Sequence, residues 1–335
     1  MELPSETRLR PAEALEEVLI RPLSTPPCLV SFSGGLDSSL VLALAARTAR
    51  RHGLELPVPV TWRFSDAPRA EESDWQEQVV RAVDLDDWCV MQAGDDLDFV
   101  GPVARRVLAR HGLCYPANTH LHEPLVARAA GGSLLTGIGG DQVLGAWVPG
   151  RRARRLRRWA AAAGEMAWLR PRARAHIQAR LAGTALVQPC SFDGRVRWQA
   201  RRRSLLLGTR ALQSIGSECG TTVVHPLLEP SFVAALCHAA GPQGLGRRHQ
   251  LLRALFGEVV PDTVIAPRRK AFLEEVFWRR HGRGLLRAWD GSGTDNALVD
   301  PDRLRAEWSR QYPDTRIALV VQQIWLDRGE GGVGS

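Results

Sequence analysis

Lysine is almost absent from this sequence of 335 residues, in which 43 of the 44 basic residues are Arg and only Lys270 is Lys. Since such a chain has exchanged Lys for Arg wherever any positive charge suffices, the retained Lys270 indicates a position that needs a compact ammonium group. The six cysteines form no C-x-x-C pair. This excludes a thiol pair of the redox or metal-binding kind and favours a cytoplasmic protein with reduced thiols.

Long apolar runs are also missing, since none approaches the ~18 residues that a membrane span requires. We therefore expect neither a membrane segment nor a signal peptide. The net charge of +8 permits an acidic partner. Ten arginines fall within residues 151–180, which form either a solvated helical face or a docking surface for an acidic peptide or protein. Aromatic residues there are limited to Trp159 and Trp168, so nucleic acid is not the expected partner.

One motif organises the rest of the chain: Ser33-Gly34-Gly35-Leu36-Asp37-Ser38-Ser39, between an apolar strand at 28–32 and a helix up to Arg51. Glycines let the backbone approach a ligand, and a helix N-terminus attracts anions, so this turn is a cradle for phosphate. It lacks the spacing and the lysine of the common P-loop. A bare carboxylate at Asp37 would repel phosphate, which indicates that it carries Mg²⁺ to a polyphosphate.

Strands and helices alternate through the first half of the chain. Further strands are predicted at 57–64, 88–91 and 133–138, and helices at 11–20, 71–83, 100–111 and 123–130. This order predicts an α/β fold, with a parallel sheet, helices on both of its faces and ligands at the carboxyl ends of its strands. We expect a nucleotide-binding part at 1–150 and a helical C-terminal part at 151–335 that shows no clear strand, carries Lys270 and packs with the first part as one domain.

Three segments in order carry a resemblance to a known family. They are the motif at 33–39, then Thr136-Gly137-Ile138-Gly139-Gly140-Asp141, and then Pro261 with Arg268-Arg269-Lys270-Ala271-Phe272. With the segments 225–229 and 251–256, they resemble the synthetase domain of the asparagine synthetase family, from about Ser24 to about Leu326. The first segment alone also resembles GMP synthetases, NAD synthetases and tRNA-modifying enzymes.

The resemblance implies a ligase that uses ATP and Mg²⁺: a carboxylate attacks the α-phosphate, and an amine then displaces AMP from the acyl-adenylate. It implies that Asp37 and Asp141 hold Mg²⁺ and converge at the carboxyl ends of their strands. Lys270 would neutralise charge in the transition states. The residues expected to bind the nucleotide or its pyrophosphate are Ser31, Ser33, Gly34, Gly35, Asp37, Ser38, Thr136 and Gly137.

Three departures from the family pattern bear on the substrate. The chain begins Met1-Glu2-Leu3, without the glutaminase domain of asparagine synthetases, so we expect no use of glutamine. Ile138 stands where asparagine synthetases have Glu and β-lactam synthetases have Tyr. Thr222 stands where the latter place the Glu that partners this Tyr. The remaining resemblance is to the macrolactam synthetases of lasso-peptide biosynthesis, which join a peptide's N-terminal amine to a side-chain carboxylate.

The expected substrate is therefore a peptide, with a precursor peptide and leader-handling proteins as partners; a small amino acid or natural-product acid is the alternative. Asn118, His120 and Ile138 are candidate substrate-binding residues, and a histidine of the segment 116–122 either serves as a base or has a structural role. A metal site at His120, His122 and Glu123 lacks further ligands nearby. An RNA-modifying enzyme and a scaffold protein without activity are the rival classes. The Lys270 segment argues against the first, and the intact Asp37, Asp141 and Lys270 argue against the second.

Overall fold

The computed structural model describes residues 9–64, 66–145, 166–267 and 271–329. The chain forms two compact units, and it passes between them more than once. One consists of Met1–Ala93, His122–Pro149 and Pro189–Ala271, and the other of Gly94–Leu121, Gly150–Gln188 and Phe272–Ser335. This division differs from the boundary at residue 150 that the sequence suggested, because segments from both halves of the chain contribute to each unit.

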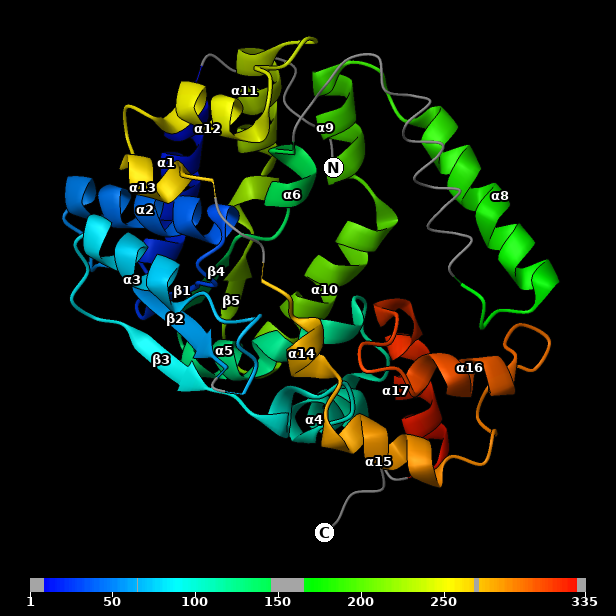
Figure 1. The fold of residues 1–335 in the computed structure, drawn as a ribbon. Helices are drawn as coiled ribbons and strands as arrows, with labels where there is room; N and C mark the ends of the chain where they lie inside the picture. The colour runs from blue at the N-terminus through cyan, green and yellow to red at the C-terminus, as the bar shows by residue number, and fades with distance from the viewer. Residues whose placement is uncertain (1–8, 65, 146–165, 268–270, 330–335) are drawn as a thin grey trace. The chain divides into compact units, whose positions relative to one another are not determined.

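A parallel sheet of five strands forms the centre of the first unit, which confirms the predicted α/β class (Figure 1). The strands are β1 (Cys28–Ser31), β2 (Val58–Arg63), β3 (Cys89–Gln92), β4 (Ser133–Thr136) and β5 (Thr222–Val224). Their order is β3-β2-β1-β4-β5. Ser31 of β1 pairs with Thr136 of β4. The connections from β1 and from β4 thus leave in opposite directions, which makes the crevice between these two strands the switch point of the topology.

Helices cover both faces of this sheet, as right-handed crossovers on the two sides of the switch point require. The helices of this unit are α1 (Pro11–Leu23), α2 (Leu36–His52), α3 (Ser73–Ala82), α5 (Glu123–Arg128), α6 (Gly140–Val143), α9 (Phe192–Ala200), α10 (Arg203–Glu218), η3 (Pro226–Leu228), α11 (Pro230–Ala240), α12 (Arg248–Phe256) and α13 (Asp262–Ile265). Helix α2 packs with α1 and α13, while α10 packs with α5 and β5. Figure 1 shows these two groups on opposite sides of the sheet.

The core of this unit explains why α2 begins where it does. From Ser38 to Ala46 every residue of α2 is buried, since the helix is covered by the sheet on one side and by neighbouring helices on the other. Val30 and Phe32 continue the same core from β1. An apolar helix of this kind fixes its own N-terminus firmly, and with it the glycine turn that leads into it.

The second unit is helical. Its helices are η1 (Asp95–Leu97), α4 (Pro102–His111), η2 (Ala117–His122), α8 (Pro171–Val187), α14 (Glu274–Phe277), α15 (Arg280–Ala288), α16 (Pro301–Trp308), η4 (Thr315–Ile317) and α17 (Ala318–Asp327). The buried Asp98 carboxylate accepts hydrogen bonds from the N–H groups of Val100, Arg279 and Gly282. It therefore fixes the start of α15. Among the described residues, no helix has the length and apolar character that crossing a membrane requires.

The sequence-based expectations for the first four strands are confirmed to within about two residues at each end. The fifth strand was missed, since residues beyond 150 were expected to form helices only. Strand β5 has three residues and pairs with β4 alone.

Candidate active site

The loop Ser33-Gly34-Gly35 is held in shape by hydroxyl groups. The Ser38 hydroxyl donates to the Gly35 carbonyl (3.1 Å), accepts from the Ser33 amide (3.3 Å) and lies 3.1 Å from the Ser33 hydroxyl. Gly34 has φ +88, and a Cβ there would lie 2.9 Å from Cγ of Gln76. The Gln76 side chain in turn donates to the Ser33 carbonyl (3.1 Å). Glycine is thus required at Gly34 both for its backbone conformation and for this close approach.

This turn ends at the N-terminus of α2. By helix geometry, the N–H groups of a first helical turn lack acceptors within the helix, and they carry the positive end of the helix dipole. Ser31 ends β1 just before the turn, and Asp37 lies in the first turn of α2. The predicted role of this turn as a phosphate cradle rests on this geometry. The hydroxyl of the buried Ser38 forms its hydrogen bonds within the loop.

The second glycine turn, between β4 and α6, lies directly against the first. A Cβ on Gly137 would lie 2.7 Å from the Ser38 nitrogen, and one on Gly140 would lie 2.1 Å from the carboxylate of Asp37. Only a residue without a side chain fits at either position. The contact brings Asp141, the residue after Gly140, to the same end of the sheet as Asp37.

The carboxylates of Asp37 and Asp141 converge on one guanidinium. Nη1 of Arg248 donates to Oδ1 of Asp141 (2.7 Å), and its Nη2 donates to Oδ1 of Asp37. The Asp37 and Arg248 side chains are 18% and 23% exposed, while that of Asp141 is 58% exposed. The pair is therefore partly buried at Asp37 and open to solvent at Asp141, and Arg248 holds the two carboxylates together.

These residues fit a magnesium ion that arrives with a polyphosphate. Mg²⁺ prefers oxygen ligands and is commonly held by one or two carboxylates together with substrate phosphates. Asp37 and Asp141 supply two carboxylates beside the phosphate cradle. The guanidinium of Arg248 now provides the positive charge between these two carboxylates. Within the described residues no group of three or more His, Cys, Asp or Glu side chains forms a metal site, so phosphate would complete the ligand set.

Thr136 is anchored by a buried histidine that the sequence did not single out. Nδ1 of His225 lies 2.7 Å from the Thr136 hydroxyl, which also accepts the Ile138 N–H (3.3 Å). Burial lowers the pKa of His225 to about 4, so the ring is neutral at pH 7, and its Nδ1 shares one hydrogen bond with the Thr136 hydroxyl. His225 thus orients Thr136 at the end of β4.

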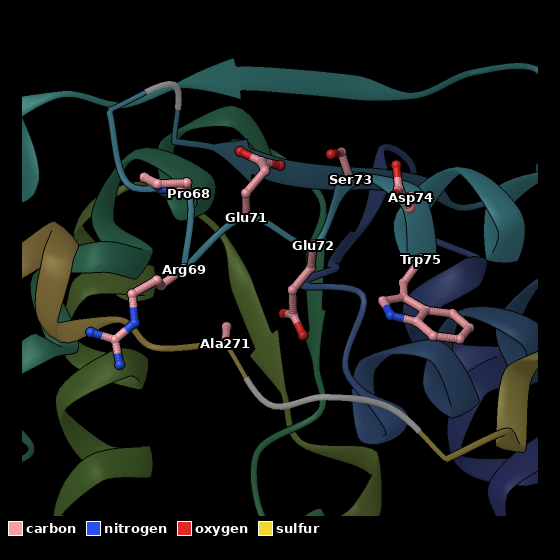
Figure 2. A pocket seen from close by; sticks show the side chains of 8 residues that line it. All are labelled: Pro68, Arg69, Glu71, Glu72, Ser73, Asp74, Trp75 and Ala271. Atoms are coloured by element: carbon pink, nitrogen blue, oxygen red, sulfur yellow. The ribbon is translucent and has the colours of Figure 1, made fainter.

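A cavity of about 320 Å³ lies beside the phosphate loop, and its volume is within the range of ligand pockets. It is lined by Pro68, Arg69, Glu71, Glu72, Ser73, Asp74, Trp75 and Ala271. In Figure 2 the Glu72 side chain lies between Arg69 on one side and Trp75 on the other. Three carboxylates and one guanidinium make the lining negative. The cavity therefore favours a cationic group over phosphate.

The remaining predicted residues lie in several places. Ile138 is half-buried in the second glycine turn. Thr222 pairs with Ser133 at the amino end of β4, so the structure does not bring it to Ile138. Lys270 lies outside the described residues, as do 151–165 of the Arg-rich stretch.

Asn118 and His120 lie in η2, where His120 is buried. Its Nδ1 lies 3.1 Å from the Ala117 carbonyl, and its Nε2 lies 2.9 Å from the Leu97 carbonyl. Both ring nitrogens thus have protein partners. These contacts favour the structural role for His120, while a part in substrate binding stays a prediction.

Two residues of the site were missed at the sequence level: Arg248 and His225. His225 lies in the segment 225–229, which contributes to the family resemblance. The sequence therefore pointed to this segment but not to the contact between His225 and Thr136. No local pattern connects Arg248 with Asp37, from which it is separated by 211 residues.

The geometry agrees with a comparison against protein families. The family model described as asparagine synthase matches residues 12–327, which covers both glycine turns, His225 and Arg248. Comparison with individual curated proteins gives no match.

Proposed function

We propose, from the premise that the chain belongs to the asparagine synthase family, that it closes a macrolactam within a ribosomally made peptide. Enzymes of this family are ATP-dependent ligases that form amide bonds. The proposal concerns the substrate: a peptide that supplies both the carboxylate and the amine. A small-molecule acid is the alternative within the same chemistry.

One observation carries the chemistry, namely the convergence of the two glycine turns at the switch point of the sheet. The first turn offers backbone N–H groups and hydroxyls to phosphate oxygens. The second brings Asp141 beside Asp37, against which Gly140 packs without room for a side chain. A loop suited to phosphate and a pair of carboxylates thus lie side by side, which supports cleavage between the α- and β-phosphates of ATP.

The reaction has two steps with ATP as a substrate. An oxygen of the substrate carboxylate attacks the α-phosphorus, the bond from this phosphorus to the oxygen of the β-phosphate breaks, and pyrophosphate leaves with the electron pair. The amine nitrogen then attacks the acyl carbon, the bond from this carbon to the AMP oxygen breaks, and one amine proton is released.

In this scheme, residues of the chain bind and orient the nucleotide and the substrate. Ser33, Gly34 and Gly35 cradle the leaving pyrophosphate. Asp37 and Asp141 would hold Mg²⁺, which when bound neutralises phosphate charge. Thr136, oriented by His225, lines the nucleotide and acyl pocket. Lys270 is proposed to stabilise charge on the α-phosphate and on the tetrahedral centre.

Ile138 supports a nucleophile that arrives on the substrate. Its apolar side chain stands in the second glycine turn, where asparagine synthetases and β-lactam synthetases carry a residue that handles the proton of the nucleophile. Ile138 cannot exchange a proton. An amine on the same peptide as the acyl group has a high effective concentration at the reacting carbon. This raises the rate of attack in a turn where Ile138 provides no proton transfer.

The acidic cavity beside the loop suits such an amine. The Glu71 carboxylate accepts the Phe64 N–H (2.9 Å) and lies 3.7 Å from Arg63, so its charge is partly balanced within the protein. We assign the N-terminal ammonium of the peptide to the side lined by Glu72 and Asp74, where a carboxylate can take up the proton that the nitrogen must lose before it attacks the acyl carbon. A Glu72→Gln variant should then raise KM for the peptide amine while the exchange of pyrophosphate into ATP stays unchanged.

Labelled pyrophosphate exchange tests the proposal. Synthetic linear peptides that carry a free N-terminal amine and a side-chain carboxylate at varied spacing are incubated with ATP, Mg²⁺ and labelled pyrophosphate. We expect label to enter ATP only when peptide is present, and ring closure to appear as the loss of one water in mass spectrometry.

The same peptides with an acetylated N-terminus provide a matched control, since they should support exchange but form no ring. Exchange and asparagine formation with aspartate and ammonia would contradict the peptide proposal, while leaving an amide ligase for a small acid.

A further inference from the structure

Arg248 contacts both candidate metal ligands through hydrogen bonds. It stands at the first position of α12, and its two terminal nitrogens reach a carboxylate oxygen on each of the two glycine turns. Two carboxylates that lie this close repel one another and need a positive charge between them. The guanidinium supplies that charge.

The position of Arg248 is fixed by the helix behind it. Leu251, Leu252 and Phe256 of α12 are buried in the core, and the Gln250 side chain accepts the Arg247 N–H (2.8 Å), which fixes the start of the helix. The backbone of Arg248 is thus held by the core packing of α12, which keeps its side chain within reach of Asp37 and Asp141.

The guanidinium and a divalent cation need the same oxygens. Arg248 uses Oδ1 of Asp37 and Oδ1 of Asp141, which are the atoms that converge between the two turns. A metal ion held by this pair would place two further positive charges against the guanidinium, at a separation at which like charges repel strongly. Arg248 and a metal ion therefore compete for these oxygens.

We infer that Arg248 is the resting counter-cation of the site, which keeps Asp37 and Asp141 converged and competes with a divalent metal until a nucleotide brings that metal in. The inference rests on the proposed metal role of the two aspartates. The nucleotide's phosphates compensate the charge of the released guanidinium, so metal binding is coupled to nucleotide binding. Free metal alone binds weakly, because it must displace Arg248 without that compensation.

Manganese binding to the protein without nucleotide tests this directly. Free Mn²⁺ is measured by electron paramagnetic resonance in titrations of the unmodified protein and of Arg248→Met, with no ATP and no substrate present. Removing one positive charge at ion-pair distance from both carboxylates should tighten Mn²⁺ binding by at least about tenfold. Asp141→Asn in the Arg248→Met background should abolish the gain.

Two further variants support the comparison. Arg253→Met, on the same helix, removes an exposed arginine that pairs with Asp262, and it should leave Mn²⁺ affinity unchanged. Arg248→Lys keeps the charge but loses the planar fork that reaches both carboxylates, so its affinity should fall between those of the parent and Arg248→Met. If Arg248→Met does not fold, the comparison of Arg248→Lys with the parent decides.

Mn²⁺ affinity in the folded Arg248 variants that equals or falls below that of the parent would overturn the inference. The absence of any Mn²⁺ binding, even with a non-hydrolysable ATP analogue, would overturn it as well, because the aspartates would then not be metal ligands. Tighter binding in Arg248→Met supports it, whether or not a peptide is ever cyclised. Failure of the macrolactam proposal is thus distinguishable from failure of this one.

Discussion

Lowering the pH should destabilise the protein through His225. The buried ring is neutral in the folded state, with its pKa lowered by burial from 6.5 to about 4. The unfolded chain therefore binds a proton between these two values that the folded chain does not bind. By linkage, the free energy of unfolding rises with pH across this window: the contribution is fully present above about pH 6.5 and is lost as the pH falls.

The magnitude follows from the two pKa values. The complete loss, reached below pH 4, is about 3 kcal/mol, because each pH unit contributes about 1.4 kcal/mol. Between pH 7.5 and pH 5.0 the same values give a loss of about 2 kcal/mol from this single group. Protonation makes both ring nitrogens donors, so Nδ1 can then only donate to the Thr136 hydroxyl.

Urea unfolding at the two pH values, in the parent and in His225→Asn, measures this effect. The Asn variant retains an acceptor for the Thr136 hydroxyl but has no titratable ring, so its free energy of unfolding should lose about 2 kcal/mol less on acidification. His52→Asn serves as the control, because His52 is exposed and its ring lies by Glu16. An equal loss in the parent and in His225→Asn would refute the reasoning.

The other predictions concern the glycine turns, the second unit and the lysine. Gly140→Ala should lower pyrophosphate exchange by on the order of 10²-fold, because its Cβ would displace the Asp37 carboxylate. Gly183→Ala, in the open on α8, should keep full exchange and gain about 0.5–1 kcal/mol in urea unfolding. Asp98→Ala leaves buried N–H groups without their acceptor and should cost about 3 kcal/mol in the same assay. Lys270→Arg should slow single-turnover AMP formation nearly as much as Lys270→Ala, and a fully active Arg variant would remove Lys270 from the catalytic residues.

Much of the first unit could be predicted because its strands are short, apolar and separated by helices. The parallel arrangement then implies that the turns after β1 and β4 meet at one edge, which is how Asp37 and Asp141 come together. By contrast, β5 carries too weak a local signal: its three residues follow Gly220, and only pairing with β4 makes them a strand.

Long-range contacts were beyond reach of the sequence. Arg248 joins the site because α12 packs in the core at a particular position, and helical periodicity says nothing of the direction in which its first residue points. The same holds for the two compact units, since contacts between segments that are distant in the sequence decide their composition.

The central claim is that this site cleaves ATP between its α- and β-phosphates to activate a carboxylate. Phosphorus NMR of a reaction mixture with ATP, Mg²⁺ and a cyclisable peptide identifies the products directly. We predict AMP and pyrophosphate in equal amounts, one of each for every amide formed, and neither product with Asp37→Asn, which should still fold. The appearance of ADP and inorganic phosphate instead would contradict the account.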